Sequence, residues 1–185
     1  MITKYPRTFP LENGFQVTLR PLLKEDEEAL KVYFQDLPLG DRLCLKEDVT
    51  DPKVIENWIY NLDCDHVLPL IALNQECIVG DATLHFNPIG WTQHQGEIRI
   101  TTDPQYREKG LGTILIQNLI DIAANLGLEQ LSAEVPPVLD KAFYLLEKMG
   151  FKEVAVLKGF VRDQEDLESD LVLMIKPLAK EPDYL

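Results

Sequence analysis

A basic, glycine-containing turn stands directly before a long apolar segment in this sequence. The residues REKGLGTILIQNLI, from Arg107 to Ile120, place two glycines one residue apart and continue with apolar residues at helical spacing. Glycine is a poor helix former, so its position needs another reason. A helix N-terminus leaves backbone N–H groups that attract anions, and glycine lets a phosphate approach closely. The stretch indicates a pyrophosphate-binding turn, or merely a connection from strand to helix.

The elements around this turn predict an α+β fold with a mixed, mostly antiparallel sheet and one crossover unit. Alternating or apolar runs predict strands at 15–20, 68–73, 77–86, 96–102, 128–135, 151–161 and 168–176. Helical spacing and capping residues predict helices at 24–37, from about 51 to 59, at 112–126 and at 139–150.

Length and composition favour one domain spanning residues 1–185. The 185 residues are 45% hydrophobic, and no repeat or Gly/Ser linker interrupts them. The net charge of −13 disfavours nucleic acid as a partner and weakly favours cationic small molecules or basic protein segments, unless it serves only solubility. No apolar run suits a signal peptide or a membrane span, so we expect a cytoplasmic protein without a membrane partner.

The three cysteines argue against two kinds of structural site. Cys44, Cys64 and Cys77 are odd in number and lack CxxC spacing, which disfavours a disulfide framework and a zinc site. Reduced thiols and no metal are therefore expected.

Known phosphate cradles can be compared with the turn. A Walker loop requires GxxxxGK[ST], which is absent. In the dinucleotide-binding turn of a nicotinamide-dependent dehydrogenase, Glu134 would bind a ribose. That turn, however, directly follows its strand and contains a third glycine, whereas here TDPQYREK intervenes and Ile114 and Leu115 occupy the place of the third glycine. A dehydrogenase is therefore kept only as a minor alternative.

A third cradle fits better. The segment ITTDPQYREKGLGTILIQNLIDIA resembles the acetyl-CoA loop of the GNAT acyltransferase superfamily, whose signature is Arg/Gln-x-x-Gly-x-Gly/Ala, and Arg107 to Gly112 match every fixed position. VTLRPLLKEDEEAL resembles that family's first strand and helix, and AFYLLEKMGF resembles its last helix and turn. The resemblance covers nearly the whole chain and implies the GNAT fold, with helices on both faces of the sheet.

The resemblance also implies a cosubstrate and the residues that bind it. Family members transfer an acyl group, usually acetyl, from CoA to an amine by direct attack in a ternary complex, and no metal is required. Loop amides would bind the pyrophosphate, while strand backbone would pair with the pantetheine arm and donate to the thioester oxygen. The expected binding residues are Ile100, Thr101, Thr102, Arg107, Glu108, Lys109, Gly110, Leu111, Gly112 and Thr113.

The acceptor would be the amine of a small molecule or of a protein lysine, and a homodimer is an open expectation. Residues that shape an acceptor pocket are expected from 37–65, from the loop around Trp91 and from the turn between the final strands.

An amine nucleophile must lose a proton, which requires a base. Glu97 is the first candidate, because it begins the strand before the loop, a position that a catalytic glutamate occupies in the histone-acetylating branch of the family. Its alternative role is an ordinary strand carboxylate paired with Arg99. His85 is the second candidate, because a hairpin would place it opposite Gly96 or Glu97. Asp81 shares the face of His85 and ranks below both.

One departure from the family pattern concerns the leaving thiolate. Many members carry Asn-x-x-Ala-x-x-x-Tyr-x-x-x-Gly-Phe near the last helix, with the tyrosine as the acid. Here the asparagine and tyrosine positions are Leu139 and Leu146, and Tyr144 lies roughly 200° around the helix from the required direction. The sequence therefore leaves two alternatives, an active N-acetyltransferase and a CoA-binding regulatory module that has lost catalysis.

Overall fold

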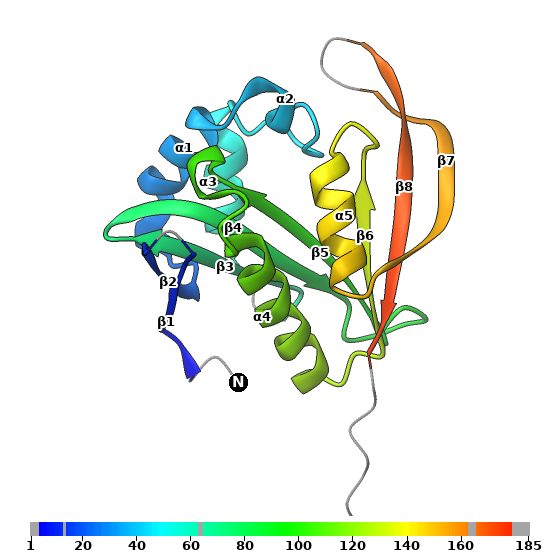
Figure 1. Cartoon of the computed structure of the whole chain (residues 1–185), viewed down its shortest axis with the longest axis horizontal. Helices are drawn as coiled ribbons and strands as arrows, with labels where there is room; N and C mark the ends of the chain where they lie inside the picture. Colours follow the sequence, from blue (N-terminus) through cyan, green and yellow to red (C-terminus); the bar gives the residue numbers. More distant parts are fainter. Residues whose placement is uncertain (1–3, 13, 63–64, 163–165, 179–185) are drawn as a thin grey trace, which may run out of the picture.

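An eight-stranded sheet runs through the molecule in the order β1-β2-β3-β4-β5-β6-β8-β7. The computed structural model describes residues 4–12, 14–62, 65–162 and 166–178 (Figure 1). The strands are β1 (Arg7–Pro10), β2 (Gln16–Pro21), β3 (Val67–Asn74), β4 (Cys77–Phe86), β5 (Gln95–Thr102), β6 (Gln130–Val135), β7 (Lys152–Arg162) and β8 (Glu168–Pro177). The helices are η2 (Lys24–Asp26), α1 (Glu27–Asp36), α2 (Leu39–Arg42), α3 (Pro52–Tyr60), η3 (Pro104–Tyr106), α4 (Leu111–Asn125) and α5 (Asp140–Lys148).

Helices cover both faces of the sheet, and each face has its own apolar cluster. On one face α4 and α5 pack against the strands in a cluster that includes Leu70, Leu84 and Leu115 (Figure 1). On the other face α1 and α3 pack in a cluster that includes Phe34 and Ile71. The predicted α+β class, with a mostly antiparallel sheet between two helical layers, is confirmed.

Most predicted elements are found within a residue or two of their expected bounds. β1 and α2 are not predicted from the sequence, because each has only four residues, too few for a repeated apolar pattern. The sequence alone predicts no strand order; in the structure β8 lies between β6 and β7 because it pairs antiparallel with both.

The sheet is divided into two halves that share only a short ladder. β4 and β5 pair along their length, from Phe86 opposite Gly96 to Gly80 opposite Thr102. The parallel ladder between β5 and β6 covers only Gln95–Glu97 on β5. Beyond that point β5 stays with β4, while β6 stays with β8 up to Val135. The two strands therefore separate as they approach the helix α4.

Glycine fixes both ends of α4. Gly110 is the N-cap residue and has a φ of 92°, a left-handed conformation that residues with a side chain rarely adopt. Gly127 follows the helix with a φ of 78°, as the sequence predicts for a helix stop. Between them Leu111, Leu115 and Leu119 are fully buried against the sheet. The turn and the buried face together set where the helix begins relative to β5.

Leu115 offers a test of this packing. Leu115→Ala is expected to lower the free energy of unfolding by about 2–5 kcal/mol, because it removes buried methyl groups and leaves a cavity under α4. Val32→Ala is the control, since Val32 is 56% exposed on α1 and should change stability little. Urea unfolding measures both, and equal losses in the two variants would contradict the assigned core.

Candidate functional site

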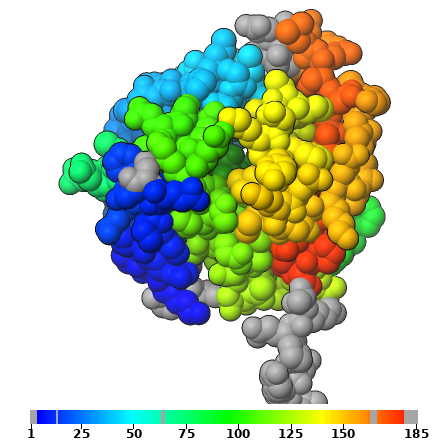
Figure 2. Space-filling model, in the orientation of Figure 1, coloured from blue at the N-terminus to red at the C-terminus, as the bar shows by residue number. Residues whose placement is uncertain are grey.

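The separation of β5 and β6 opens a gap bounded by backbone. Among the described residues, the β5–β6 ladder ends at Glu97 opposite Ser132, so Ile98 to Thr102 turn one backbone edge toward the gap. The predicted binding residues Ile100, Thr101 and Thr102 all lie in this edge. In the space-filling view a hollow separates the green surface at the start of α4 from the yellow surface of α5 (Figure 2). An extended ligand can pair with such an edge as an added strand does.

The N-terminus of α4 closes one end of the gap with backbone N–H groups. The N–H of Ile114 donates to the carbonyl of Gly110 at 3.0 Å, which is the first bond of the helix. The N–H groups of Leu111, Gly112 and Thr113 precede this bond, and a helix gives such groups no internal partner. These amides and the helix dipole suit a phosphate or another anion.

Side chains of the turn hold its shape. The Arg107 guanidinium donates to Asp41 at 2.6 Å and to the carbonyl of Thr102 at 3.0 Å, which ties the end of β5 to α2. The Lys109 ammonium donates to the carbonyl of Gln105. The side chains of Arg107 and Lys109 therefore hold the backbone of the turn, and its N–H groups stay available to a ligand.

Two other residues of the turn have roles in its backbone and packing. Glu108 has a φ of 57° and pairs with Lys141 of α5. A Cβ on Gly112 would lie 2.7 Å from Cδ2 of Leu145, so glycine at this position also lets α5 approach α4. The two glycines of the predicted signature thus meet different needs: Gly110 needs its backbone angle, and Gly112 needs close approach.

Polar side chains line one face of β4 and β5, on the side covered by α1 and α3. The register places Asp81 opposite Thr101, Thr83 opposite Arg99 and His85 opposite Glu97. The sequence predicts His85 opposite Gly96 or Glu97 across the hairpin, and in the structure it lies opposite Glu97.

This polar face forms one wall of a cavity of about 240 Å³. The opposite walls are apolar and aromatic, with side chains that include Leu22, Leu30, Phe34, Leu45, Trp58 and Leu62. Leu45, Trp58 and Leu62 lie in the region 37–65, where the sequence predicts acceptor-pocket residues, whereas Trp91 is 93% exposed and does not line the cavity. Residues 163–165 of the turn between the final strands lie outside the described residues. A cavity with one polar and one apolar wall suits an amphipathic small group.

Glu97 lies in a network of charged side chains at the point where the gap between β5 and β6 begins. Its carboxylate accepts from Nζ of Lys46 and from Nε of Arg99, both at 2.8 Å. Burial raises the pKa of Glu97, but the hydrogen bonds and charges of Lys46 and Arg99 lower it more, and the balance lies below the ordinary value. Lys46 also pairs with Glu134 of β6 at 2.7 Å. In this arrangement Glu97 is an ionised carboxylate and a weak base.

The two other acid–base candidates have opposite shifts. Burial, followed by the charge of Arg99, lowers the pKa of His85 to about 4, so its ring is neutral near pH 7. Burial raises the pKa of Asp81 to about 7, and a hydrogen bond of 3.4 Å from Thr83 offsets only part of this effect. Asp81, which the sequence analysis ranks last, therefore has the pKa nearest to neutral pH among the three.

The family position for the acid is occupied by a buried leucine. Leu146 is the buried residue of α5, 6% exposed, and belongs to the same apolar cluster as Leu115 of α4. Tyr144 is 59% exposed, and Nζ of Lys148 lies 5.1 Å from the centre of its ring. As the helical spacing predicts, the side chains of Tyr144 and Leu146 lie on different sides of α5.

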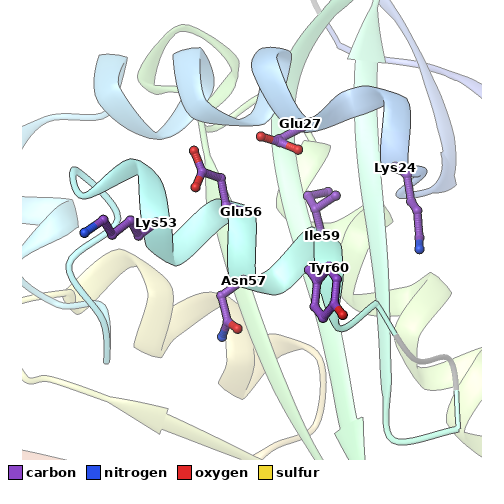
Figure 3. A pocket seen from close by; sticks show the side chains of 7 residues that line it. All are labelled: Lys24, Glu27, Lys53, Glu56, Asn57, Ile59 and Tyr60. Atoms are coloured by element: carbon purple, nitrogen blue, oxygen red, sulfur yellow. The ribbon is translucent and has the colours of Figure 1, made fainter.

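A second hollow lies on the outer surface between α1 and α3. Figure 3 shows that its lining residues come from these helices and from η2, and they include Lys24, Glu27, Glu56 and Tyr60. Glu27 and Glu56 both pair with Lys31, so the two acids are already part of an ion-pair network. This hollow shares Asn57 with the cavity but takes no side chain from β4 or β5.

The described part of the chain shows neither a metal cluster nor a membrane-spanning helix. Within it, no three or more His, Cys, Asp or Glu side chains gather in a way that could hold a metal ion. No helix there is long and apolar enough to cross a membrane. Cys44 and Cys77 form no disulfide, and Cys64 lies outside the described residues.

The fold and the site define a class of protein: a sheet that splits beside an amide-rich helix N-terminus, with a polar-faced cavity next to the split. The sequence profile of the acetyltransferase (GNAT) family matches residues 28–151. This chain belongs to that family. The match removes the nicotinamide-dependent alternative and confirms the resemblance noted in the sequence.

Similar proteins agree with this assignment. The chain is 31% identical over 80 residues to the [ribosomal protein bS18]-alanine N-acetyltransferase of Escherichia coli K12, which covers 43% of this chain and 53% of that protein. The chain thus spans about half the length of the curated relatives that it matches.

Solved structures share the fold. A GNAT acetyltransferase from Streptococcus pneumoniae has a TM-score of 0.75 at 20% identity and covers 87% of this chain and 99% of that one. A phosphinothricin acetyltransferase from Sinorhizobium meliloti, solved in complex with AcCoA, has a TM-score of 0.76 at 19% identity, with coverage of 91% and 92%.

Sequence reasoning missed Lys46 and the role of Asp41 in the site. Asp41 lies in the four-residue helix α2 and Lys46 in the segment between α2 and α3, where no periodic pattern marks a position relative to the sheet. Glu134 carried a readable signal, because it is a carboxylate within the otherwise apolar end of a strand. From the sequence alone, Glu134 is given only the role of a ribose ligand.

The charge network predicts a pKa change that can be measured. Lys46→Met is expected to raise the pKa of Glu97, because a hydrogen bond and a positive charge are lost while the burial of the carboxyl stays. Carbon-detected NMR titration of the labelled carboxyl measures the shift, and Lys53→Met, at an exposed position of α3, is the control. An unchanged titration of Glu97 in Lys46→Met would contradict the network.

Proposed function

We propose that this protein is an acetyl-CoA-dependent N-acetyltransferase that acetylates a primary amine by direct attack within a ternary complex. The main support is the gap between β5 and β6, which ends at the free amides of α4. Acetyl-CoA supplies the acetyl group as an activated thioester. The acceptor is the amine of a small molecule or of a protein, as the names of the similar proteins suggest. A cytoplasmic location belongs to the proposal.

In this proposal the backbone of the gap binds the cosubstrate. The amides from Lys109 to Thr113 hold the pyrophosphate, and Gly110 leaves room for it because nothing lies within 4 Å of the Cβ position. The free edge of Ile100 to Thr102 pairs with the pantetheine arm. An N–H of the same edge donates to the thioester oxygen and stabilises the charge that develops there.

The cavity holds the body of the acceptor. Its volume of about 240 Å³ is smaller than that of most drug-sized pockets, which have about 300–1,000 Å³. It therefore suits a small amine or a single side chain of a protein substrate. The carboxyl group of Asp81 faces this space and accepts one long hydrogen bond, so it can accept another from an ammonium group.

Glu97 is the proposed base, with His85 as its neighbour across the ladder. A carboxylate with a lowered pKa is a poor base, so Glu97 acts only after Lys46 has moved away. His85 is neutral near pH 7 and can pass a proton through its ring. No tyrosine occupies the position of Leu146, and a thiol pKa of roughly 8.5 lets the thiolate depart without one.

A CoA-binding regulatory module without catalysis is the second candidate function. Two observations favour it: Leu146 stands at the tyrosine position, and Glu97 is engaged by two cations. A screen of amines and peptides for acceptor-dependent release of CoA thiol separates the two. Release above the hydrolysis rate supports an enzyme, whereas stoichiometric CoA binding without release under any acceptor supports the module.

Gly112→Glu is expected to abolish acetyl-CoA binding, because it places a carboxylate where phosphate oxygens are proposed to lie. Isothermal titration calorimetry measures the affinity. Gly112→Ala is the matched variant, since its Cβ meets the same Leu145 side chain without adding charge, and it should weaken binding much less. Wild-type affinity in Gly112→Glu would count against the cradle.

Glu97→Gln is expected to lower turnover by roughly 100-fold or more while acetyl-CoA affinity stays the same, because the base is lost and the backbone cradle is untouched. Steady-state kinetics from pH 6 to about pH 9 would measure the effect. Glu76→Gln, in the exposed turn between β3 and β4, is the control. A wild-type rate at every pH would remove Glu97 from the mechanism.

A further inference from the structure

The amino group of Lys46 lies between two carboxylates that come from different strands. Nζ is 2.8 Å from Oε1 of Glu97 on β5 and 2.7 Å from Oε2 of Glu134 on β6. The ladder between these strands ends at Glu97 opposite Ser132, and Glu134 lies two residues further along β6. The Lys46 amine therefore bridges the two strands where the gap begins.

The place of this amine, not the length of its ion pairs, distinguishes it from an ordinary surface ion pair such as Lys158 with Asp170. Lys46 comes from the segment between α2 and α3, which lies outside the sheet, and its flexible side chain reaches in to the wall of the cavity. Both carboxylate oxygens lie within the distance of about 2.6–3.2 Å that a general base requires for proton removal. The side chain is 45% exposed, so it is not locked in the core.

We propose that Lys46 is an internal acceptor, which the protein acetylates on Nζ from acetyl-CoA. This inference rests on the proposed function, since it uses the same gap and the same cosubstrate. Glu134 takes one proton from the ammonium, and the amine then attacks the thioester carbonyl. The nitrogen releases its second proton to solvent as the amide forms. The new Nζ–C bond replaces the C–S bond, and the CoA thiolate leaves and takes up a proton from solvent.

Acetylation of Lys46 would change the charge at the mouth of the gap. An acetylated lysine is neutral, so both ion pairs of Lys46 are lost and only Arg99 remains beside Glu97. Lys46, Arg99, Glu97 and Glu134 together carry no net charge, whereas the acetylated group carries one negative charge. The modification thus frees Glu97 to act as a base and favours the entry of a cationic acceptor.

The experiment incubates the full chain with acetyl-CoA labelled in the acetyl group, without any acceptor, and maps the label by peptide mass spectrometry. Lys46 is expected to be labelled at least roughly 100-fold faster than Lys53, because placement next to the thioester replaces a bimolecular encounter. Lys53 is exposed at the start of α3 and reports non-enzymatic acetylation of a nearby lysine.

Two variants complete the design. Lys46→Arg keeps the positive charge but has no amine that can be acetylated at neutral pH, so the fast labelling should vanish. Gly112→Glu should lose the fast labelling of Lys46 and keep the slow labelling of Lys53. Labelling of Lys46 that is no faster than that of Lys53, or that persists in Gly112→Glu, would overturn the inference.

The outcomes also separate this inference from the proposed function. If acetyl-CoA binds in calorimetry and an added amine causes thiol release, but Lys46 stays unlabelled, the inference fails and the acetyltransferase proposal stands. If acetyl-CoA does not bind at all, the proposed function fails, and the inference fails with it.

Discussion

The structure depends on the short length over which β5 and β6 pair. β5 and β6 share only three register positions, because each strand has another partner that leads it away: β4 accompanies β5 to Thr102, and β8 accompanies β6 to Val135. Backbone groups that lose a partner in a partly buried place cost about 1–3 kcal/mol each unless something else satisfies them. A ligand with its own amide groups can do so, and the fold keeps this place open for one.

The surrounding contacts hold the gap in shape. Arg107 fixes the end of β5 to α2 through Asp41, and Gly112 lets α5 pack closely on α4. Polar groups are then arranged along the gap: helix amides with partial positive charge lie at one end, and the carboxylates Glu97 and Glu134, both paired with Lys46, lie at the other. This arrangement suits a ligand with an anionic group at the α4 amides and, at its other end, a thioester that reacts with an amine. The acetyltransferase proposal and the role inferred for Lys46 both follow from it.

Much of the fold and part of the site could be predicted from the sequence. The alternating strands, the glycine stop at Gly127 and the turn before α4 are local patterns, and the structure contains them where expected. The fold class followed from their order. Elements of four residues, such as β1 and α2, could not be predicted because they are too short to show a repeated apolar pattern.

The chemistry of the site was harder to predict because it depends on contacts between distant segments. The position of His85 opposite Glu97 follows from hairpin register, which a sequence can indicate. The pairing of Lys46 with Glu97 and Glu134, which lie 51 and 88 positions further along the chain, cannot be predicted in this way. This pairing, together with Arg99, lowers the pKa of Glu97. The raised pKa of Asp81 likewise comes from helices that fold over β4.

The central claim is that the edge of β5 and the amides of α4 bind acetyl-CoA. Residue-resolved amide hydrogen exchange, measured by NMR with and without acetyl-CoA, tests it most directly. The account predicts slower exchange on binding for amides within Ile98–Thr102 and at Leu111, Gly112 and Thr113. Binding that leaves these amides unprotected, or that protects only other parts of the chain, would contradict it.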